Sequence, residues 1–205
     1  MICEIIVVGE IDTNCYIVAA EAGADALLID PGADADVIQA ALDRHHCKVG
    51  LIVNTHGHYD HIGADGDFDA PVAVHPDDAA MLRDARKNYS ADFGKSVEVK
   101  NTIRYVEDGQ RIIVGGLTLK VLHTPGHSAG GISLLLEKPR TGILFSGDAL
   151  FAGSVGRTDL GGSREALTRS IKSKLLTLPD ETIVYPGHGP ATTIGAERRD
   201  NPFLS

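Results

Sequence analysis

The sequence VNTHGHYDH, residues 53–61, places His56, His58, Asp60 and His61 within six residues, directly after a predicted strand. Imidazole nitrogen and carboxylate oxygen are the usual protein ligands of Zn²⁺ and related ions. In a loop at a strand end such side chains can converge on one point, whereas a helix would spread them around its circumference. The segment therefore predicts a metal-binding loop.

Three further ligand-type residues stand in similar places: His127, Asp148 and His188 each follow a predicted strand. Each comes directly after a glycine, and a histidine or aspartate in that position is usually a turn residue, so none is decisive by itself. Together they repeat one pattern: a strand, then small or proline residues, then one ligand-type side chain. This repetition places all of them at one edge of the predicted sheets.

The remaining pattern predicts many short strands and few helices. Because the strands cluster in consecutive runs and do not alternate with helices, sheets packed together with helices outside fit better than a doubly wound sheet. Short β-branched runs between turn residues predict strands at 2–8, 15–20, 26–30, 51–55, 71–74, 103–106, 111–114, 117–122, 132–137, 142–146 and 182–185. Apolar spacing and N-cap residues such as Asp34 and Ser163 predict helices at 34–45, 77–87, 163–176 and 192–199.

Composition narrows the classes of function. The 205 residues carry a net charge of −9, which disfavours nucleic acid and anionic membranes as partners. No apolar run approaches the ~20 residues that span a bilayer, and the first residues lack the basic start of a signal peptide. Three cysteines without paired spacing indicate free thiols, as in a reducing cytosol. We therefore expect a cytoplasmic protein.

The motif His56-x-His58-x-Asp60-His61, followed by His127, Asp148 and His188, resembles the complete ligand set of the metallo-β-lactamase superfamily. The resemblance extends over essentially the whole chain. It implies an α+β fold, namely an αββα sandwich of two packed mixed sheets with helices outside and the site at one edge. It also implies that residues 1–205 form a single domain.

The resemblance further implies two divalent metal ions, zinc with iron or manganese as alternatives. One ion would be held by three histidines, the other by Asp60 and two histidines, and Asp148 would bridge them. In full, the implied ligands are His56, His58 and His127 for the first ion, Asp60, His61 and His188 for the second, and Asp148 for both.

This ligand set predicts hydrolysis. Two divalent ions, the carboxylates of Asp60 and Asp148 and one bridging hydroxide leave one net positive charge when the histidines bind as neutral imidazoles. Such a site favours an anionic tetrahedral transition state, and metal-bound water with a pKa near 7 supplies the nucleophile. Asp60 and Asp148 are therefore the candidate catalytic carboxylates.

Residues 145–160 and 185–198 resemble the glyoxalase II-like group, which implies hydroxyacylglutathione hydrolase activity on S-lactoylglutathione. A thioester suits the site, because a thiolate with a pKa near 8.5 leaves without a general acid. Full-length members of that group hold glutathione with a C-terminal helical domain. The sequence ends soon after His188 without it, and so resembles the short, single-domain bacterial members.

Two alternatives stay open beside the thioesterase. Persulfide dioxygenases share the ligand set but bind one iron, which His56, His127 and Asp148 would hold. A hydrolase of another small ester or lactone is the other alternative. Secreted zinc β-lactamases are disfavoured, because they usually have a signal peptide and lack the bridging aspartate.

Four residues outside the ligand set have two interpretations each. Arg157 could contact an anionic substrate, or pair with Asp159. Asp30 could orient a ligand histidine, since such rings usually donate their second nitrogen to a carboxylate, or it could be a turn residue. Tyr89 and Phe93 could cover the cleft, or be ordinary aromatic residues.

Overall fold

Residues 1–204 are described by a computed structural model, and most of their strands belong to two six-stranded sheets. The first sheet takes its strands in chain order; β1 to β3 pair antiparallel, and β3 to β6 pair parallel. Its strands are β1 (Ile2–Val8), β2 (Thr13–Ala19), β3 (Asp25–Ile29), β4 (Lys48–Val53), β5 (Val72–Val74) and β6 (Ile103–Tyr105).

The second sheet is also mixed. Its order is β14, β13, β10, β9, β8, β7, and only β10 and β13 pair parallel. Gly115 and Gly116, both with positive φ, form the turn between β7 and β8. The strands are β7 (Arg111–Val114), β8 (Leu117–His123), β9 (Ile132–Lys138), β10 (Ile143–Gly147), β13 (Ile183–Pro186) and β14 (Thr192–Thr193); β11 (Leu150–Phe151) and β12 (Ser154–Val155) form a separate ribbon.

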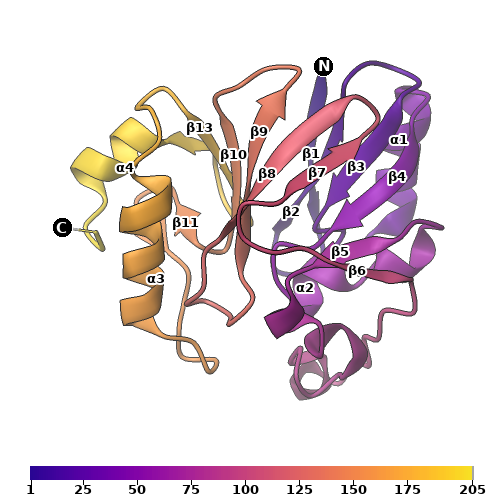
Figure 1. Ribbon diagram of the computed structural model, residues 1–205. Helices are drawn as coiled ribbons and strands as arrows, with labels where there is room; N and C mark the ends of the chain where they lie inside the picture. Colours follow the sequence, from indigo (N-terminus) through magenta and orange to yellow (C-terminus); the bar gives the residue numbers. More distant parts are fainter. Residues whose placement is uncertain (205) are drawn as a thin grey trace.

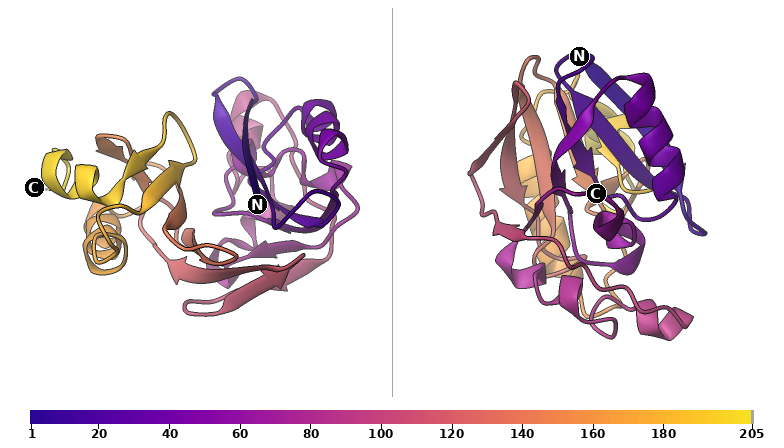
Figure 2. Two further views of the ribbon diagram at one scale, coloured as in Figure 1. Left: turned by 90° about the horizontal axis from the view of Figure 1, so that it is seen from above. Right: turned by 90° about the vertical axis from the view of Figure 1, so that its right-hand side faces the viewer.

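The helices lie on the outer faces of the two sheets, so the expected αββα sandwich is confirmed. Figures 1 and 2 show α1 (Ala35–Arg44) outside the first sheet, and α3 (Arg164–Ser170) with α4 (Ile194–Asp200) outside the second. Three apolar cores match these layers: one under α1, one between the sheets and one under α3 and α4. Burial on both faces is why the central strands are nearly continuous apolar runs.

The helix predicted at 77–87 is wrong. This segment forms two 3₁₀ turns, Pro76–Asp78 and Met81–Arg83. Side chains compete with the helical hydrogen bonds here, since Asp84 Oδ1 accepts from the Arg86 amide and Asn88 Nδ2 donates to the Met81 carbonyl. A further 3₁₀ turn spans Ser90–Phe93.

The other predicted helices need smaller corrections. Ser163 caps α3 as expected, but the helix continues after Ser170 as the π-helical segment Ile171–Leu175. The last helix starts at Ile194, because residues 192–193 pair with β13 and Thr193 is the N-cap. Asp34 precedes α1 without capping it; its carboxylate accepts a hydrogen bond from the Gly9 amide instead.

No helix within residues 1–204 is long and apolar enough to cross a membrane. The three cysteines are free thiols, as the sequence predicts.

Candidate metal centre

The ligand-type residues follow the carboxyl ends of strands in both sheets. β3 and β4 run parallel in the first sheet, and Asp30 directly follows β3 while His56 comes shortly after β4. In the second sheet β8, β10 and β13 share one direction, because β8 and β10 are both antiparallel to β9 and β13 is parallel to β10. His127, Asp148 and His188 follow these three strands. The topology thereby brings all of them to one edge.

The first group consists of three buried histidines whose ring nitrogens point at one another. His127 Nε2 lies 3.3 Å from His56 Nε2 and 2.9 Å from His58 Nδ1. All three side chains are shielded from solvent. Three nitrogens this close in a buried place form a ready trigonal face for one metal ion.

The second group consists of Asp60, His61 and His188. Asp60 Oδ2 lies 3.1 Å from His61 Nε2 and 3.3 Å from His188 Nε2. The sequence predicts a loop here, but Asp60 and His61 lie on the single turn of α2 (Tyr59–Ile62). The two side chains still meet, as the 3.1 Å contact between Asp60 Oδ2 and His61 Nε2 shows.

Asp148 lies between the two groups. One carboxylate oxygen, Oδ1, is 3.5 Å from His61 Nε2, and the other, Oδ2, is 3.4 Å from His127 Nε2. Gly187 makes room for it, since a Cβ at that position would lie 2.1 Å from Asp148 Oδ1. Oδ2 also lies 3.7 Å from His188 Nε2, so the carboxylate contacts both groups and is placed to serve two ions at once.

Burial favours the neutral form of two histidines of the first group, His56 and His58. Burial lowers the pKa of His56 well below its usual value, and the neighbouring histidines act in the same direction. Burial, followed by the effect of His127, lowers the pKa of His58 to about 3. Neutral imidazoles keep the lone pairs that a metal ion needs.

The second group is dominated by charge. Burial alone would lower the pKa of His61, but the carboxylates of Asp60 and Asp148 outweigh it and raise that pKa well above the usual value. Burial would also lower the pKa of His188, but the hydrogen bond with Asp60 and the charges of Asp148 and Asp60 together raise it. The same carboxylates would attract a metal cation to this place.

Two buried polar atoms in the centre have no hydrogen-bond partner in the described chain: His61 Nε2 and Asp148 Oδ1. Buried polar atoms are nearly always satisfied in folded proteins. Both atoms point into the space between the two groups, and a divalent cation there would satisfy both. The donor set, rich in imidazole with two carboxylates, also suits zinc or iron. The residues present therefore fit two metal ions.

The far nitrogens of the ligand rings are held by fixed acceptors. Asp30 Oδ2 lies 3.0 Å from His61 Nδ1, and the same carboxylate accepts hydrogen bonds from the amide and the hydroxyl of Thr55. His127 Nδ1 lies 2.7 Å from the Arg157 carbonyl oxygen. Contacts of this kind fix ring orientation and tautomer.

Asp78 was missed by the sequence interpretation. This buried carboxylate accepts hydrogen bonds from the Gly57 amide at 3.1 Å, the Ser128 hydroxyl at 2.7 Å and the Gly130 amide at 2.6 Å. It thus joins the loop that carries His56 to the loop that carries His127. It lies in the segment predicted to be a helix, and no local sequence signal distinguishes it from a surface aspartate.

A pocket of about 450 Å³ opens beside the centre. Five of the seven candidate ligand residues line it. Tyr89 and Phe93 also line it, in agreement with the interpretation that they cover the cleft. Arg157 also lines it, but its guanidinium is paired with the Asp159 carboxylate at 2.7 and 2.6 Å. The remaining lining residues are Ile11, Tyr59, Asn88, Phe151, Ser154, Val155 and Leu160.

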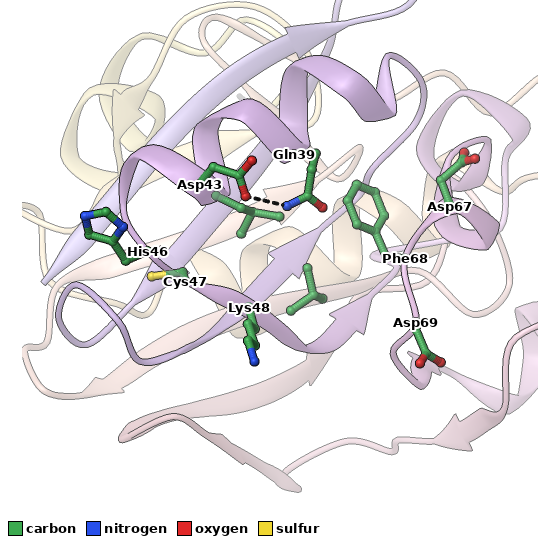
Figure 3. A pocket seen from close by; sticks show the side chains of 10 residues that line it. Gln39, Asp43, His46, Cys47, Lys48, Asp67, Phe68 and Asp69 are labelled. Carbon is green, nitrogen blue, oxygen red and sulfur yellow. Dashed lines mark hydrogen bonds between the residues drawn. The ribbon is translucent and has the colours of Figure 1, made fainter.

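A larger hollow of about 680 Å³ lies elsewhere, beside α1 and the start of β4 (Figure 3). It carries Asp43, His46, Lys48, Asp67 and Asp69. These polar side chains point from separate segments, and no three of its His, Cys, Asp or Glu residues are close enough to hold an ion. The pocket beside the histidines is therefore the candidate active site, although it is the smaller one.

Comparison with known proteins agrees with this geometry. Residues 8–188 match the Metallo-beta-lactamase superfamily. The chain is 38% identical to the probable metallo-hydrolase YqgX of Bacillus subtilis, covering 97% of this chain and 95% of that one. It is 32% identical to the hydroxyacylglutathione hydrolase GloC of Haemophilus influenzae, covering 98% and 97%.

Solved structures give the same result. BLEG-1, described as a B3 metallo-beta-lactamase, is 39% identical with a TM-score of 0.92, covering 100% of both chains. TTHA1623 in a di-iron-bound form is 39% identical with a TM-score of 0.85, covering 98% of this chain and 100% of that one. ETHE1 from Myxococcus xanthus is 32% identical with a TM-score of 0.80, covering 98% and 84%.

Proposed function

The chain belongs to the metallo-beta-lactamase superfamily, and on that premise we propose that it is a dinuclear metal-dependent hydrolase that cleaves small acyl thioesters. S-lactoylglutathione is the first substrate to test, in keeping with the likeness to a hydroxyacylglutathione hydrolase. We propose zinc as the metal, with iron or manganese as alternatives; the likeness to a di-iron-bound structure keeps iron in view.

The observation that carries this proposal is the position of Asp148. Its carboxylate lies between the two ligand groups, with Oδ1 3.5 Å from His61 Nε2 and Oδ2 3.4 Å from His127 Nε2 and 3.7 Å from His188 Nε2. Contact with both groups supports a carboxylate shared by two ions. Two bound divalent ions would supply Lewis acidity and lower the pKa of a water molecule to about 7.

The residues of this chain contribute orientation and enclosure. Asp30, Thr55 and Asp78 hold the ligand loops in place through buried hydrogen bonds. The pocket opens directly onto Asp60, Asp148 and His188, so a carbonyl seated there meets the centre. In the reaction the acyl carbon gains a bond to the oxygen of water, and the carbon–sulfur bond breaks with its electron pair on sulfur. The thiolate leaves without a proton donor, because its pKa is near 8.5.

One observation favours a second candidate, a persulfide dioxygenase with a single iron. The likeness to ETHE1 extends over 98% of this chain at a TM-score of 0.80. His56, His127 and Asp148, which would hold that iron, lie together in the structure. Three ligands on one side of an ion and open positions on the other suit oxygen activation.

The deciding experiment measures the metal content and the activity of one purified sample. Near two metal ions per chain with hydrolysis of S-lactoylglutathione would support the thioesterase. Near one iron per chain with persulfide-dependent oxygen uptake would favour the dioxygenase. A fully loaded sample active on neither substrate would exclude the dioxygenase and the glutathione thioester, and other thioesters, lactones and β-lactams would be the next substrates.

A further inference from the structure

The pocket beside the centre has an apolar wall from the segment after the first ligand loop. Tyr59, Tyr89 and Phe93 line it, and the rings of Tyr59 and Phe93 lie 5.0 Å apart at a tilt of 37°. The Tyr89 hydroxyl donates to the Leu160 carbonyl at 2.8 Å, so it does not offer this hydrogen to a ligand. Phe93 is 62% exposed, which leaves a large aromatic face at the pocket open to water.

A second wall comes from the segment after Asp148. Phe151, Val155 and Leu160 line the pocket from this side of the chain. Ile11, from the turn between β1 and β2, adds another apolar side chain and is 48% exposed. Apolar residues therefore reach the pocket from three separate segments.

The polar side chains of the pocket, apart from the metal ligands, are largely engaged with the protein. Asn88 donates to the carbonyls of Met81 and Val97 and accepts from the Ser90 amide, which uses its whole amide group. The hydroxyl of Tyr59 remains for a ligand, and that of Ser154 has a long contact of 3.5 Å with the Val155 carbonyl oxygen. This pattern suits a ligand with few polar groups in the pocket.

Positive charge in the pocket is already neutralised. Arg157 is the cation that lines it, and both arms of its guanidinium bind Asp159. Lys95, which lies over the Tyr59 ring, pairs with Glu10 at 3.1 Å. Glutathione brings two carboxylates and an ammonium group, and desolvating such charges without partners is unfavourable. The volume of the pocket does not distinguish glutathione from a smaller apolar group, because a pocket of about 450 Å³ holds drug-sized ligands.

Resting on the proposed thioesterase function, we infer that the preferred substrates are thioesters with an uncharged aromatic or aliphatic thiol part, and that glutathione thioesters are poor ones. The apolar walls would bury that group, while the carbonyl faces Asp60 and Asp148. Hydrolysis of such a substrate releases a carboxylate and an apolar thiol.

The test compares two thioesters that share the lactoyl group: S-lactoylglutathione and the uncharged S-benzyl thioester of lactic acid. We expect kcat/KM of the metal-loaded protein to be at least about 10-fold higher for the benzyl thioester. Phe93→Ser should lower that value about 10-fold through KM and lower the value for the glutathione thioester by a smaller factor. Ile113→Ser is the matched control, because Ile113 is a 74% exposed apolar side chain on β7 that does not line the pocket.

The outcomes separate this inference from the proposed function. A preference for S-lactoylglutathione, or an equal loss with both substrates in Phe93→Ser, would overturn the inference and leave the thioesterase standing. If neither thioester is hydrolysed, the proposed function fails. Calorimetric binding of two non-hydrolysable thioethers then still decides the inference: tighter binding of benzyl 2-hydroxypropyl thioether than of S-propylglutathione supports it, and the reverse order refutes it.

Discussion

The metal centre and the pocket beside it are built in opposite ways. In the centre, four of the five histidines are buried, and the far ring nitrogens of His61 and His127 are fixed by a carboxylate and a carbonyl. In the pocket, the wall is made by turns and short ribbons, and residues such as Phe93 and Ile11 are half exposed. Most side chains of the centre are fixed by burial and several contacts, whereas the side chains of the pocket wall have few such contacts.

The two regions should therefore differ in how well they tolerate substitutions. A residue of the centre is linked to several others, so its substitution should disturb metal binding and catalysis together. A residue of the pocket wall sits on a loop and should alter the choice of substrate while the centre stays intact. Substitutions in the two regions test whether their consequences differ in this way.

The largest effect is expected from Asp148→Ala in the centre. The substitution removes the only carboxylate among the described residues that faces both ligand groups, and at least one metal ion should be lost with it. Hydrolytic activity should fall by about 10³-fold or more. Metal analysis of the purified variant, beside a kinetic assay, measures both.

Phe93→Ser is the control for this variant, since it changes the pocket and should keep the full metal content. An Asp148→Ala protein that retained two ions and full activity would refute the assignment of the bridging ligand.

A smaller loss is expected from Asp30→Asn. Asp30 does not lie among the ligands, but it holds His61 Nδ1 at 3.0 Å and the Thr55 amide at 2.7 Å. An amide accepts less strongly and can present its nitrogen to the ring, so metal affinity should fall about 10- to 100-fold. Competition with a chelator gives the affinity. Asp69→Asn, at an exposed aspartate of the larger hollow, should leave it unchanged.

The third prediction concerns the free energy of unfolding and a buried aspartate, Asp65. Asp65 is fully buried; burial raises its pKa well above the usual value, and Asn54 Nδ2 contacts its Oδ1 at 3.2 Å. Asp65 Oδ2 and Asn54 Oδ1 have no partner in the described chain. An amide at position 65 can donate to Asn54 Oδ1 and still accept from Asn54 Nδ2. Asp65→Asn should therefore stabilise the fold at pH 7 by about 1 kcal/mol.

The sign of the pH dependence checks this prediction. An acid whose pKa is raised in the folded state binds more protons there than in the unfolded state, so stability falls as pH rises above the ordinary aspartate value of 3.8. Asp65→Asn should remove this decline, which urea unfolding at several pH values would show. A variant less stable than the parent at pH 7 would mean that Asp65 is ionised and satisfied.

The contrast between the regions also explains what could be predicted from the sequence. The convergence of the ligand-type residues could be predicted, because most of them stand in a short local pattern after a strand, as Asp148 does after β10. The αββα sandwich followed from the resemblance and from the consecutive runs of strands. Asp78 could not be predicted, since its three partners come from loops distant in the chain. The helix predicted at 77–87 failed because local side-chain hydrogen bonds replaced helical ones.

The smallest effect is expected from Arg157→Ala. The guanidinium is exposed and paired with Asp159, and exposed ion pairs contribute little. The contact with His127 comes from the carbonyl of residue 157, which alanine keeps. KM for either thioester should stay within about 2-fold of the parent, with unchanged metal content and little change in Tm.

Asp159→Ala is the informative partner of this variant, because it releases the guanidinium beside the pocket without altering the carbonyl. The freed cation should lower KM for S-lactoylglutathione and leave the benzyl thioester unaffected. A KM for S-lactoylglutathione that rises about 10-fold in Arg157→Ala would instead show that the arginine leaves its ion pair to bind the anionic substrate. The pocket wall would then carry a charge-selective residue, and its contrast with the centre would be one of rigidity alone.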